Sequence, residues 1–459
     1  MSIQNKIAQY RAYQAGIEHC TFNPDEFGVV RIHLVPPKFK LFGNSSHIVI
    51  LNGYYILPIG YAWAILLSNF MKEVNAYSGK PLDDETMDGI LSRTLKQTQH
   101  TYPTTNPEFF KQDLEVILNV LFDIAHGGNP DADIEQLSIR SYANYMVAPH
   151  RMDLMISAMT DEKGCWKCNQ KCVFCYAAGQ EYSQTRELST DEWKHAIDRL
   201  KDAHVPMITF TGGEPTLRDD LVELVDYSKW FVTRLNTNGV KLTSELCAEL
   251  KAASLDSVQI TLYSADESVH NSLVGSTHYQ DTIQGIQNAV AAGLDVSVNT
   301  PLCKKNADYS ATISLLYRLG VRFVTLSGLI CTGGGALRHE EYDLSENELY
   351  SIVKATKEFC VSNEMEMDFT SPGLIPKEKL EELSLNVPMC GAALSNMAIA
   401  PDGTVIPCQS WLSKGSGLGN ILTDSWKKIW SHKRALALRR MSEDDALTCP
   451  FRNLCKEEQ

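Results

Sequence analysis

The segment Cys165–Tyr176 reads CWKCNQKCVFCY and holds four of the 13 cysteines in this 459-residue chain. Three of them, Cys168, Cys172 and Cys175, follow the spacing CxxxCxxC. Positions i, i+4 and i+7 share one face of a helix, so a buried helical face is one interpretation of the three thiols. The residues around them are polar, show little helical patterning and directly follow an apolar run. This context favours a loop that presents thiols to a ligand.

Two kinds of metal group fit such a loop. Structural zinc needs four ligands in paired hooks, and Cys165 would supply the fourth. Three thiolates instead suit a [4Fe–4S] cluster with one iron left open, because such clusters normally take four cysteines. An open iron is useful only where a substrate or a second cofactor fills it. The segment by itself leaves both alternatives open.

From Leu154 onward, short apolar runs alternate with amphipathic helical patterns such as those at 189–200 and 279–293. The predicted strands are LMISAMT (154–160), MITFT (207–211), FVTRLN (231–236), SVQITLY (257–263), DVSVNTPL (295–302) and RFVTLSGLI (322–330). This repetition predicts an α/β fold with a parallel sheet over residues 151–345, either rolled into a partial (β/α)6 barrel of TIM type or left open, with its sites at the carboxyl ends of the strands. We expect the alternation to stop after Asp343.

The first 130 residues carry a different pattern. Short β-like runs lie at 29–35, 47–51 and 54–59. Asn52 and Gly53 between the last two runs are a strong hairpin signal. Helical patterns follow at 61–75, 84–98 and 107–125. We predict a small α+β domain of winged-helix type at 1–130 and a linker at 131–150.

Composition narrows the class of protein. The net charge of -14 argues against nucleic acid as a partner, because surfaces that bind phosphates are usually basic. The start, MSIQNKIAQY, lacks a signal pattern, and no apolar run approaches the ~18 residues of a membrane-spanning helix. We therefore expect a cytoplasmic protein without a membrane partner. In a reducing compartment an odd number of cysteines favours metal ligands and core residues over disulfides.

GGEP at Gly212–Pro215 stands at the end of the second predicted strand, where alone it predicts only a tight turn. Together with CxxxCx-aromatic-C, in which Phe174 is the aromatic residue, and with the βα repetition, it resembles the radical S-adenosylmethionine (radical SAM) superfamily. The resemblance implies that Cys168, Cys172 and Cys175 hold a [4Fe–4S] cluster whose open iron binds S-adenosylmethionine. Electron transfer then yields a 5′-deoxyadenosyl radical that abstracts hydrogen from a substrate.

The same resemblance implies where S-adenosylmethionine binds. Glycines let the backbone approach closely, and a carboxylate suits the ammonium group of the cofactor. NTNG (236–239), LYS (262–264) and Asn299 lie on the third to fifth strands, where family members hold the ribose and carboxylate, although ordinary turn chemistry is the alternative. The implied cofactor-binding residues are Phe174, Gly212, Gly213, Glu214, Pro215, Asn236, Asn238, Ser264 and Asn299.

A second cysteine set lies near the C-terminus. Cys390, Gly403 and Cys408 are spaced C-x12-G-x4-C, and Cys449 and Cys455 follow as CPFRNLC. With LGNILTDSWKKIWSH (418–432), this set resembles the SPASM/twitch extension of radical SAM enzymes. The resemblance implies at least one auxiliary iron–sulfur cluster, of [4Fe–4S] type, in residues 346–459.

The set departs from the full SPASM pattern, because Ala446 and Gln459 stand where that pattern has flanking cysteines. We favour one auxiliary cluster held by Cys390, Cys408, Cys449 and Cys455. Two under-ligated clusters are an alternative, as is one cluster completed by Cys331, by Cys360 or by substrate. A structural zinc ion on the same four cysteines is a further alternative.

Enzymes with SPASM or twitch extensions commonly modify peptides, and several begin with a small winged-helix module, which residues 28–128 resemble. The resemblance implies that the third helix and an exposed strand edge hold the leader of a precursor peptide by strand addition. We predict a maturase of a ribosomally made peptide, which closes a thioether or carbon–carbon crosslink. Its electron donor would be a protein such as flavodoxin or ferredoxin.

Other functions stay open. These are a sulfatase-type formylglycine maturase, a peptide epimerase and a dehydrogenase of a small-molecule cofactor or antibiotic. A non-enzymatic zinc- or cluster-bearing peptide-binding protein is the alternative from another class. Cys331, at the end of the sixth predicted strand, and Cys165 are the candidate catalytic thiols, and a packed or incidental thiol is the alternative for each.

Overall fold

The computed structural model describes residues 18–24, 28–35, 47–77, 81–128, 136–143 and 145–450. The chain divides into two compact units. Unit 1 consists of Met1–Val147 with Trp230–Val232, and unit 2 consists of Ala148–Lys229 with Thr233–Gln459.

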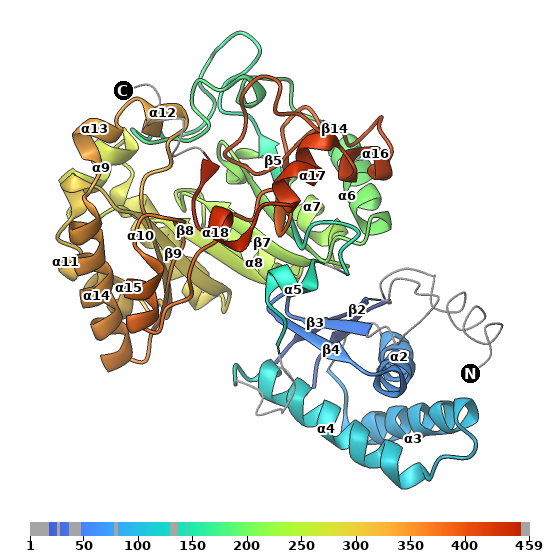
Figure 1. The fold of residues 1–459 in the computed structure, drawn as a ribbon. Helices are drawn as coiled ribbons and strands as arrows, with labels where there is room; N and C mark the ends of the chain where they lie inside the picture. Colours follow the sequence, from blue (N-terminus) through green and yellow to red (C-terminus); the bar gives the residue numbers. More distant parts are fainter. Residues whose placement is uncertain are drawn as a thin grey trace. The chain divides into compact units, whose positions relative to one another are not determined.

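Unit 1 contains an antiparallel sheet whose strands lie side by side in chain order (Figure 1). They are β1 (Glu18–Phe22), β2 (Val30–Val35), β3 (His47–Leu51) and β4 (Tyr55–Ile59). The predicted hairpin is confirmed as β3–β4, where Asn52 and Gly53 have φ angles of 49° and 68°. A tight two-residue hairpin loop needs this left-handed pair. β1 lies outside the predicted runs, because its sequence EHCTF is short and half polar.

The helices of unit 1 follow the sheet, as the sequence predicts. They are α2 (Tyr61–Asn75), α3 (Asp84–Thr101) and α4 (Pro107–Ala125), with the short α5 (Ile139–Tyr142) further along the chain. Asp83 caps α3 by accepting a hydrogen bond from the N–H of Thr86 at 2.8 Å. Phe22 and Phe70 pack edge to face, 5.5 Å apart between ring centroids, in a core shared by sheet and helices. The small α+β domain is therefore confirmed.

Unit 2 is built on a sheet that contains every strand predicted for the barrel. They are β5 (Arg151–Ser157), β6 (Met207–Gly212), β7 (Val232–Thr237), β8 (Ser257–Thr261), β9 (Asp295–Pro301) and β10 (Phe323–Ser327). These strands lie in chain order, and the pairs β5–β6, β7–β8, β8–β9 and β9–β10 are parallel. The partial barrel is therefore confirmed.

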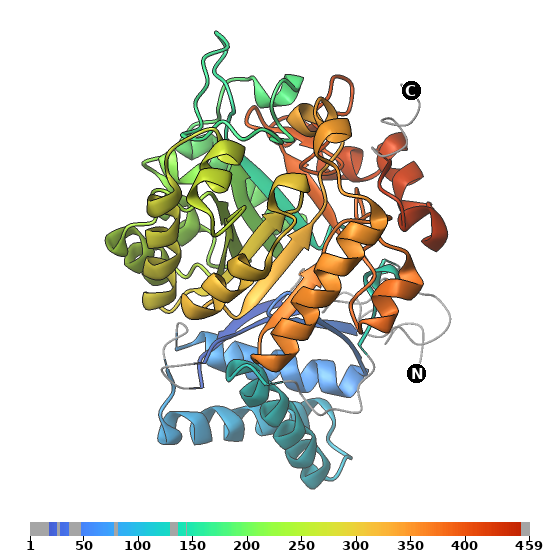
Figure 2. The same cartoon turned by 90° about the vertical axis from the view of Figure 1, so that its left-hand side faces the viewer.

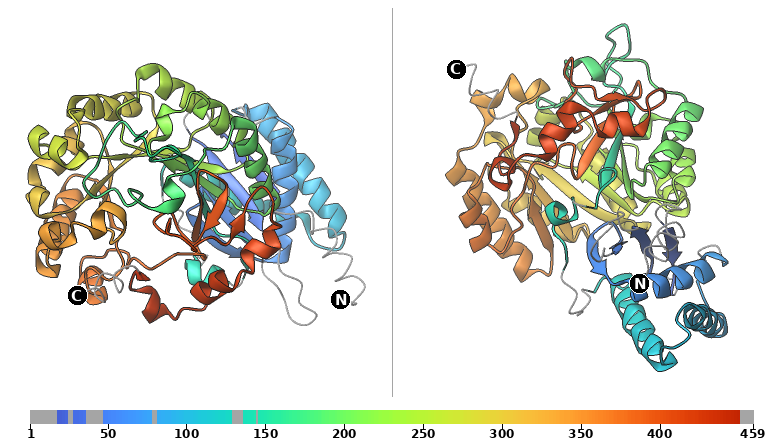
Figure 3. Two further views of the ribbon diagram at one scale, coloured as in Figure 1. Left: turned by 90° about the horizontal axis from the view of Figure 1, so that it is seen from above. Right: turned by 45° about the vertical axis from the view of Figure 1, so that its right-hand side comes forward.

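The helices between these strands cover the outer face of the curved sheet (Figure 3). They are α6 (Thr190–Asp202), α7 (Leu221–Tyr227), α8 (Ser244–Ala252), α9 (Glu267–Val274), α10 (Tyr279–Ala291) and α11 (Ser310–Arg318). Trp193 of α6 is completely buried, and Ser189 and Glu192 close a capping box at the start of this helix. The carboxyl ends of the strands stay open for a binding site.

The alternation of helix and strand continues beyond Asp343, where we expected it to stop. After the short α12 (Gly333–Ala336) and α13 (His339–Tyr342), α14 (Glu346–Ser362) leads to β11 (Glu366–Phe369). β11 pairs in parallel with β10 and extends the sheet (Figure 2). The expectation was wrong because β11 is short, and Glu366 and Asp368 make half of it acidic.

The C-terminal region joins the opposite end of the same sheet. β12 (Asn396–Ile399) pairs in parallel with β5, β13 (Thr404–Ile406) pairs antiparallel with β12, and β14 (Gly419–Asn420) pairs with β13. Its short helices are α15 (Lys377–Glu382), α16 (Trp426–Trp430), α17 (Lys433–Arg439) and α18 (Glu443–Ala446). The later cysteines are thereby attached to β5, the strand that leads into CWKCNQKCVFCY. In the described part of the chain, no helix has both the length and the apolar composition that crossing a membrane requires.

Candidate active site

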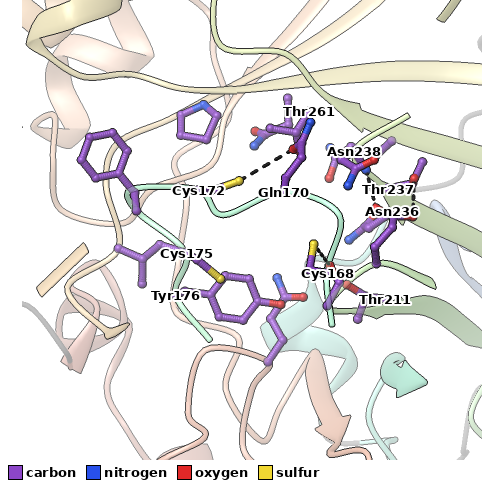
Figure 4. Close-up of a pocket in the computed structure, with 18 of the residues that line it drawn as sticks. Cys168, Gln170, Cys172, Cys175, Tyr176, Thr211, Asn236, Thr237, Asn238 and Thr261 are labelled. Carbon is purple, nitrogen blue, oxygen red and sulfur yellow. Dashed lines mark hydrogen bonds between the residues drawn. The ribbon is translucent and has the colours of Figure 1, made fainter. Parts of the chain in front are cut away.

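A cavity of about 250 Å³ lies at the carboxyl ends of β6 to β10 (Figure 4). Its lining includes the last residues of β8, β9 and β10, which are Thr261, Pro301 and Ser327. It also includes most of the predicted site, namely Cys168, Cys172, Phe174, Cys175, Gly212, Gly213, Glu214, Asn236, Asn238 and Asn299. The fold thus brings together residues from six separate segments of the sequence.

Cys168, Cys172 and Cys175 lie on the connection between β5 and α6. Residues 168–179 form turns and bends there and no helix. This arrangement excludes the buried helical face as an explanation of their spacing. All three thiols border the same cavity, whereas Cys165 is exposed and does not line it.

The C-terminal end of α9 anchors the cysteine loop. The N–H groups of Lys171 and Val173 donate to the carbonyls of Val274 and Leu273, each at 2.9 Å. Phe174, which is 7 % exposed, packs edge to face on Tyr342 with ring centroids 5.0 Å apart. The backbone bonds to α9 and the packing of Phe174 on Tyr342 therefore fix the loop in place.

The three thiols are a suitable donor set for an iron–sulfur cluster. Burial raises the pKa of Cys168 to about 12. Burial first, and then the charges of Cys175 and Cys168, raise the pKa of Cys172 well above its ordinary value. Deprotonation of the three thiols therefore requires a positively charged group beside them. A metal ion meets this requirement, because it binds the thiolates in place of their protons. Among the described residues, no three Cys, His, Asp or Glu side chains are arranged around a single ion position.

The glycines of GGEP allow the end of β6 to lie close against the end of β5. Gly212 has φ +140°, and a Cβ on Gly212 would collide with the carbonyl oxygen of Ser157. A Cβ on Gly213 would lie 2.6 Å from the carbonyl oxygen of Ala158. The carbonyl of Gly213 faces the Sγ of Cys168 at 3.5 Å. Side chains larger than hydrogen would push the GGEP loop away from the end of β5.

Glu214 is a buried carboxylate held by hydrogen bonds from the chain. Its Oε1 accepts from the Thr216 N–H at 3.0 Å, the Thr216 hydroxyl at 2.6 Å and the Thr237 hydroxyl at 2.7 Å. Its Oε2 accepts only from the Asn238 N–H, at 2.8 Å, among the bonds found in the described residues. Burial raises the pKa of Glu214, and these bonds oppose that rise. Oε2 therefore keeps the capacity to accept one more donor from the cavity.

The remaining wall is polar and comes from neighbouring strands. The Nε2 of Gln259 donates to the Thr325 hydroxyl at 3.1 Å, and that hydroxyl donates to the Oδ1 of Asn299 at 3.0 Å. The buried Oδ1 of Asn236 has no hydrogen-bond partner among the described residues. An unpaired buried acceptor beside a cavity is a position where a ligand's donor fits. The polar wall, Glu214 and the three thiols together fit S-adenosylmethionine on a cluster.

Other predicted residues lie outside the cavity lining. Pro215 begins a 3₁₀ turn, η2 (Pro215–Leu217), and the hydroxyl of Ser264 accepts from the Asp266 N–H at 3.0 Å. Cys331 is half-buried and follows Ile330, which does line the cavity. The part that Pro215, Ser264, Cys165 and Cys331 take in binding or catalysis stays a prediction.

The C-terminal cysteines come together from distant segments. Burial raises the pKa of Cys408 to about 12, and the charges of Cys390 and Cys449 add to that rise, so both of these thiols lie within electrostatic range of Cys408. The N–H of Cys390 donates to the carbonyl of Ala446 at 2.6 Å. Cys455, the fourth predicted ligand, lies outside the described residues. The described thiols suit an auxiliary cluster by the same reasoning as the first set.

The sequence reasoning missed several cavity residues. They are Met159, Gln170, Tyr176, Thr211, Gln259, Thr261, Pro301, Ser327, Gly328, Leu329, Ile330 and Gln409, whereas Thr237 and Tyr263 lie within the predicted stretches 236–239 and 262–264. Thr211, Gln259 and Thr261 lie at or near the carboxyl ends of predicted strands, so inward-facing alternate positions there would have found them. Gln409, next to Cys408, had no such signal.

The two cysteine regions are also tied to each other. The Nε2 of Gln180 donates to the carbonyl of Tyr176 and, at 3.2 Å, to the carbonyl of Ser410. The N–H of Tyr182 donates to the carbonyl of Leu412 at 3.0 Å. These bonds place the segment after Cys408 beside the loop that carries Cys175.

Comparison with known families agrees with both cysteine sets. Residues 167–316 match the Radical SAM superfamily, and residues 390–456 match SPASM, described as an iron–sulfur cluster-binding domain. The mycofactocin maturase MftC of Mycolicibacterium smegmatis is 28% identical over 274 residues, which cover 58% of this chain and 68% of the relative. The Fe-coproporphyrin III synthase of Methanosarcina barkeri is 27% identical over 287 residues, covering 58% and 71%.

Solved structures share the fold at low sequence identity. SuiB of Streptococcus suis superposes with a TM-score of 0.57 at 14% identity, covering 97% of both chains. The same protein bound to its precursor peptide SuiA gives the same TM-score and covers 93% of this chain and 90% of SuiB. anSMEcpe with bound AdoMet gives 0.51 at 15% identity, covering 67% of this chain and 88% of that chain.

Proposed function

We propose that this chain, whose residues 167–316 match the Radical SAM superfamily and whose residues 390–456 match SPASM, matures a ribosomally synthesised peptide by closing a thioether or carbon–carbon crosslink. The observation that carries the proposal is the fold shared along 97% of the chain with SuiB, a protein also solved with a precursor peptide. The relationship to the maturase MftC supports it further. Both comparisons include more than the catalytic barrel.

The barrel residues have distinct roles in this proposal. Cys168, Cys172 and Cys175 would hold the [4Fe–4S] cluster, and the free lone pairs on Oε2 of Glu214 would accept the ammonium group of S-adenosylmethionine. When both are bound, the cluster and S-adenosylmethionine supply a carbon-centred radical that removes a hydrogen atom from the substrate. Phe174, together with the other apolar groups behind the cysteine loop, keeps water from that side of the cavity.

The C-terminal cysteines serve the second half of the reaction. Closing a crosslink removes two hydrogens from the peptide: one leaves as a hydrogen atom, and the other leaves as a proton and an electron. An auxiliary cluster held by Cys390, Cys408, Cys449 and Cys455 would provide an acceptor for that electron. The hydrogen bonds of Gln180 to Tyr176 and Ser410 would fix this site relative to the cysteine loop.

Unit 1 would recognise the leader of the precursor peptide. Helix α4 exposes Phe109 and Val116, residues that are 60% and 44% exposed and lie seven positions apart on one helical face. A leader that pairs with the outer edge of β4 would have to displace a segment of this chain that is already hydrogen-bonded there. The N–H of Leu137 already donates to the carbonyl of Ile56 at 2.8 Å, and Pro58 of β4 has no N–H to offer.

Mass spectrometry on the product tests the proposed reaction. The reconstituted enzyme is incubated without oxygen with S-adenosylmethionine, a reductant and the small peptide encoded beside its gene, in H₂O and in D₂O. Loss of two hydrogens is the expected result for a crosslink. Unchanged mass with deuterium uptake would mean epimerisation, and a peptide unchanged in both solvents would refute the proposal.

Leader binding to unit 1 is tested by removing the hydrogen bond that Leu137 makes to β4. Leu137→Pro removes the N–H that occupies Ile56, so leader affinity should rise several-fold, since one hydrogen bond is worth about 1 kcal/mol. Leu137→Ala keeps the N–H and is the matched control. Equal affinities for both variants, measured by fluorescence anisotropy, would place the leader away from the β4 edge. Absence of binding to either full-length variant would refute leader recognition.

A second candidate function is the oxidation of a tetrapyrrole or another small molecule. The Fe-coproporphyrin III synthase and the AdoMet-dependent heme synthase of Methanosarcina barkeri are 27% and 26% identical to this chain. The match to the heme synthase covers 87% of that protein and only 63% of this chain. Unchanged peptide combined with turnover of an iron porphyrin substrate would favour this candidate.

A further inference from the structure

Gln170 is a buried amide inside the cysteine loop that the proposed mechanism does not use. It lies between Cys168 and Cys172, lines the cavity and is 4% exposed (Figure 4). Its Oε1 faces the Sγ of Cys172 at 3.8 Å. Its Nε2 is buried and has no hydrogen-bond partner among the described residues. An unsatisfied buried donor destabilises the fold, so its presence calls for an acceptor.

The neighbouring Asn169 resembles Gln170, because its Oδ1 faces the Sγ of Cys168 at 3.8 Å and its buried Nδ2 has no partner among the described residues. Its amide orientation is nevertheless fixed by a further hydrogen bond. The Oδ1 of Asn169 accepts from the Nδ2 of Asn238 at 2.7 Å. The Oδ1 of Asn238 in turn accepts from the Val240 N–H at 3.0 Å, which fixes the orientation of both amides. For the Gln170 amide, the contact with Cys172 is the only one found in the described residues. That contact is of the weak kind that a thiol donates.

The acceptor follows from the chemistry of a cysteine ligand. A thiol donates weakly to an amide oxygen, whereas a thiolate bound to iron can only accept. The Oε1 of Gln170 would then oppose a negatively charged sulfur. Turning the amide by half a rotation relieves this opposition and brings the orphan Nε2 to Cys172. Both problems, the unsatisfied donor and the repelled oxygen, have this one solution.

We propose that Gln170 donates a hydrogen bond from Nε2 to the sulfur of Cys172 and thereby raises the reduction potential of the cluster on the cysteine loop. The proposal rests on the assignment of Cys172 as a cluster ligand. Hydrogen bonds to ligand sulfurs stabilise the more negative, reduced form of a cluster. Gln170 thus acts through its neighbour, and it is a positioning and tuning residue of the reductive step.

The potential of the cluster tests this role. Gln170→Met keeps the length of the side chain and removes the donor. In the anaerobically reconstituted full-length enzyme, the cluster signal that changes when S-adenosylmethionine is added should titrate at a more negative potential in Gln170→Met. Iron content and S-adenosylmethionine affinity should match the wild type. Gln184→Met, the same substitution at an exposed position, is the control and should leave the potential unchanged.

A measurement on the wild-type enzyme is independent of any loss of cluster in the variant. With glutamine labelled by ¹⁵N at the side-chain amide, pulsed EPR of the reduced cluster should show a nitrogen coupling that Gln170→Met lacks. Absence of that coupling would overturn the proposal. An unchanged potential with weaker S-adenosylmethionine binding would also overturn it, because the donor would then serve the cofactor's carboxylate. If Cys172→Ala retains the full cluster signal, the ligand assignment fails and this inference falls with it.

Discussion

The two cysteine sets of this chain are built in opposite ways. Cys168, Cys172 and Cys175 come from one short loop, and that loop borders a cavity lined by five further strand ends. Cys390, Cys408 and Cys449 come from segments separated by the β12–β13 hairpin and by several short helices. These later segments meet because β12 pairs with β5 and because the N–H of Cys390 donates to Ala446.

This difference indicates which parts of the chain hold each cysteine set in position. The first set needs little more than its own loop and two backbone bonds to α9, so its spacing is readable as a local motif. The second set must close long segments, whose ordering costs conformational entropy before any ligand is bound. Binding of a metal group repays such a cost, so occupancy and folding are coupled more strongly at the second set. Loss of the first set should remove chemistry, and loss of the second should also remove stability.

The largest effect is expected at the first set. Replacing Cys168, Cys172 or Cys175 by Ala should reduce 5′-deoxyadenosine production to background, because each thiolate would hold one iron of the cluster. Chromatography of the products measures it. Cys247→Ala, which removes a buried cysteine of α8 away from the cavity, serves as the control and should keep the activity. Continued formation of 5′-deoxyadenosine by the three variants would refute the assignment of these cysteines as cluster ligands.

The second set should separate cofactor cleavage from peptide modification. Cys390→Ala or Cys408→Ala should abolish the modified peptide while 5′-deoxyadenosine still forms, because the surplus electron loses its acceptor. The unfolding temperature should also fall relative to the first-set variants. Calorimetry and peptide mass spectrometry on the same samples measure both effects. Full peptide modification by Cys408→Ala would show that this set has no part in the reaction.

A smaller effect is expected at the carboxylate that accompanies only the first set. Glu214→Gln removes the charge and places an amide donor beside the N–H of Asn238 or the hydroxyls that now donate to Glu214. The affinity for S-adenosylmethionine should fall roughly tenfold to a hundredfold, the value of one charge-assisted hydrogen bond. Isothermal titration measures it. Glu223→Gln, at an exposed ion pair with Lys194, is the matched control, and equal affinities in both variants would exclude the ammonium role.

The smallest effect is expected on the pH dependence of stability, through His270 in α9, the helix that anchors the cysteine loop. Burial lowers the pKa of His270, in α9, to about 4, and its Nδ1 accepts from the Tyr263 N–H at 3.3 Å. The unfolded chain therefore binds more protons between about pH 6.5 and 4, and stability falls as the pH drops through this window.

His270→Gln should flatten this pH dependence, because a glutamine oxygen can accept the same bond without titrating. Chemical unfolding at several pH values compares the variant with the wild type, and the other histidines are common to both. Parallel stability curves would show that protonation of His270 does not oppose folding.

The sequence was sufficient for the barrel strands and for the loop of three thiols, because periodicity and short spacing are local properties. It was insufficient for β1 and β11, whose few residues are too polar to stand out. It also gave no sign that β12 joins β5, since pairing between distant strands leaves no local pattern. Gln259 was missed because a polar residue inside a strand becomes informative only once its inward face is known.

The iron content of the purified protein tests the separation of the two sites most directly. Iron and acid-labile sulfide are measured per chain in the wild type, in a variant lacking Cys168, Cys172 and Cys175, and in a variant lacking Cys390 and Cys408. Two independent [4Fe–4S] sites predict about eight irons in the wild type and about four in each variant. Zinc in place of iron, or loss of all iron from either variant, would contradict this account.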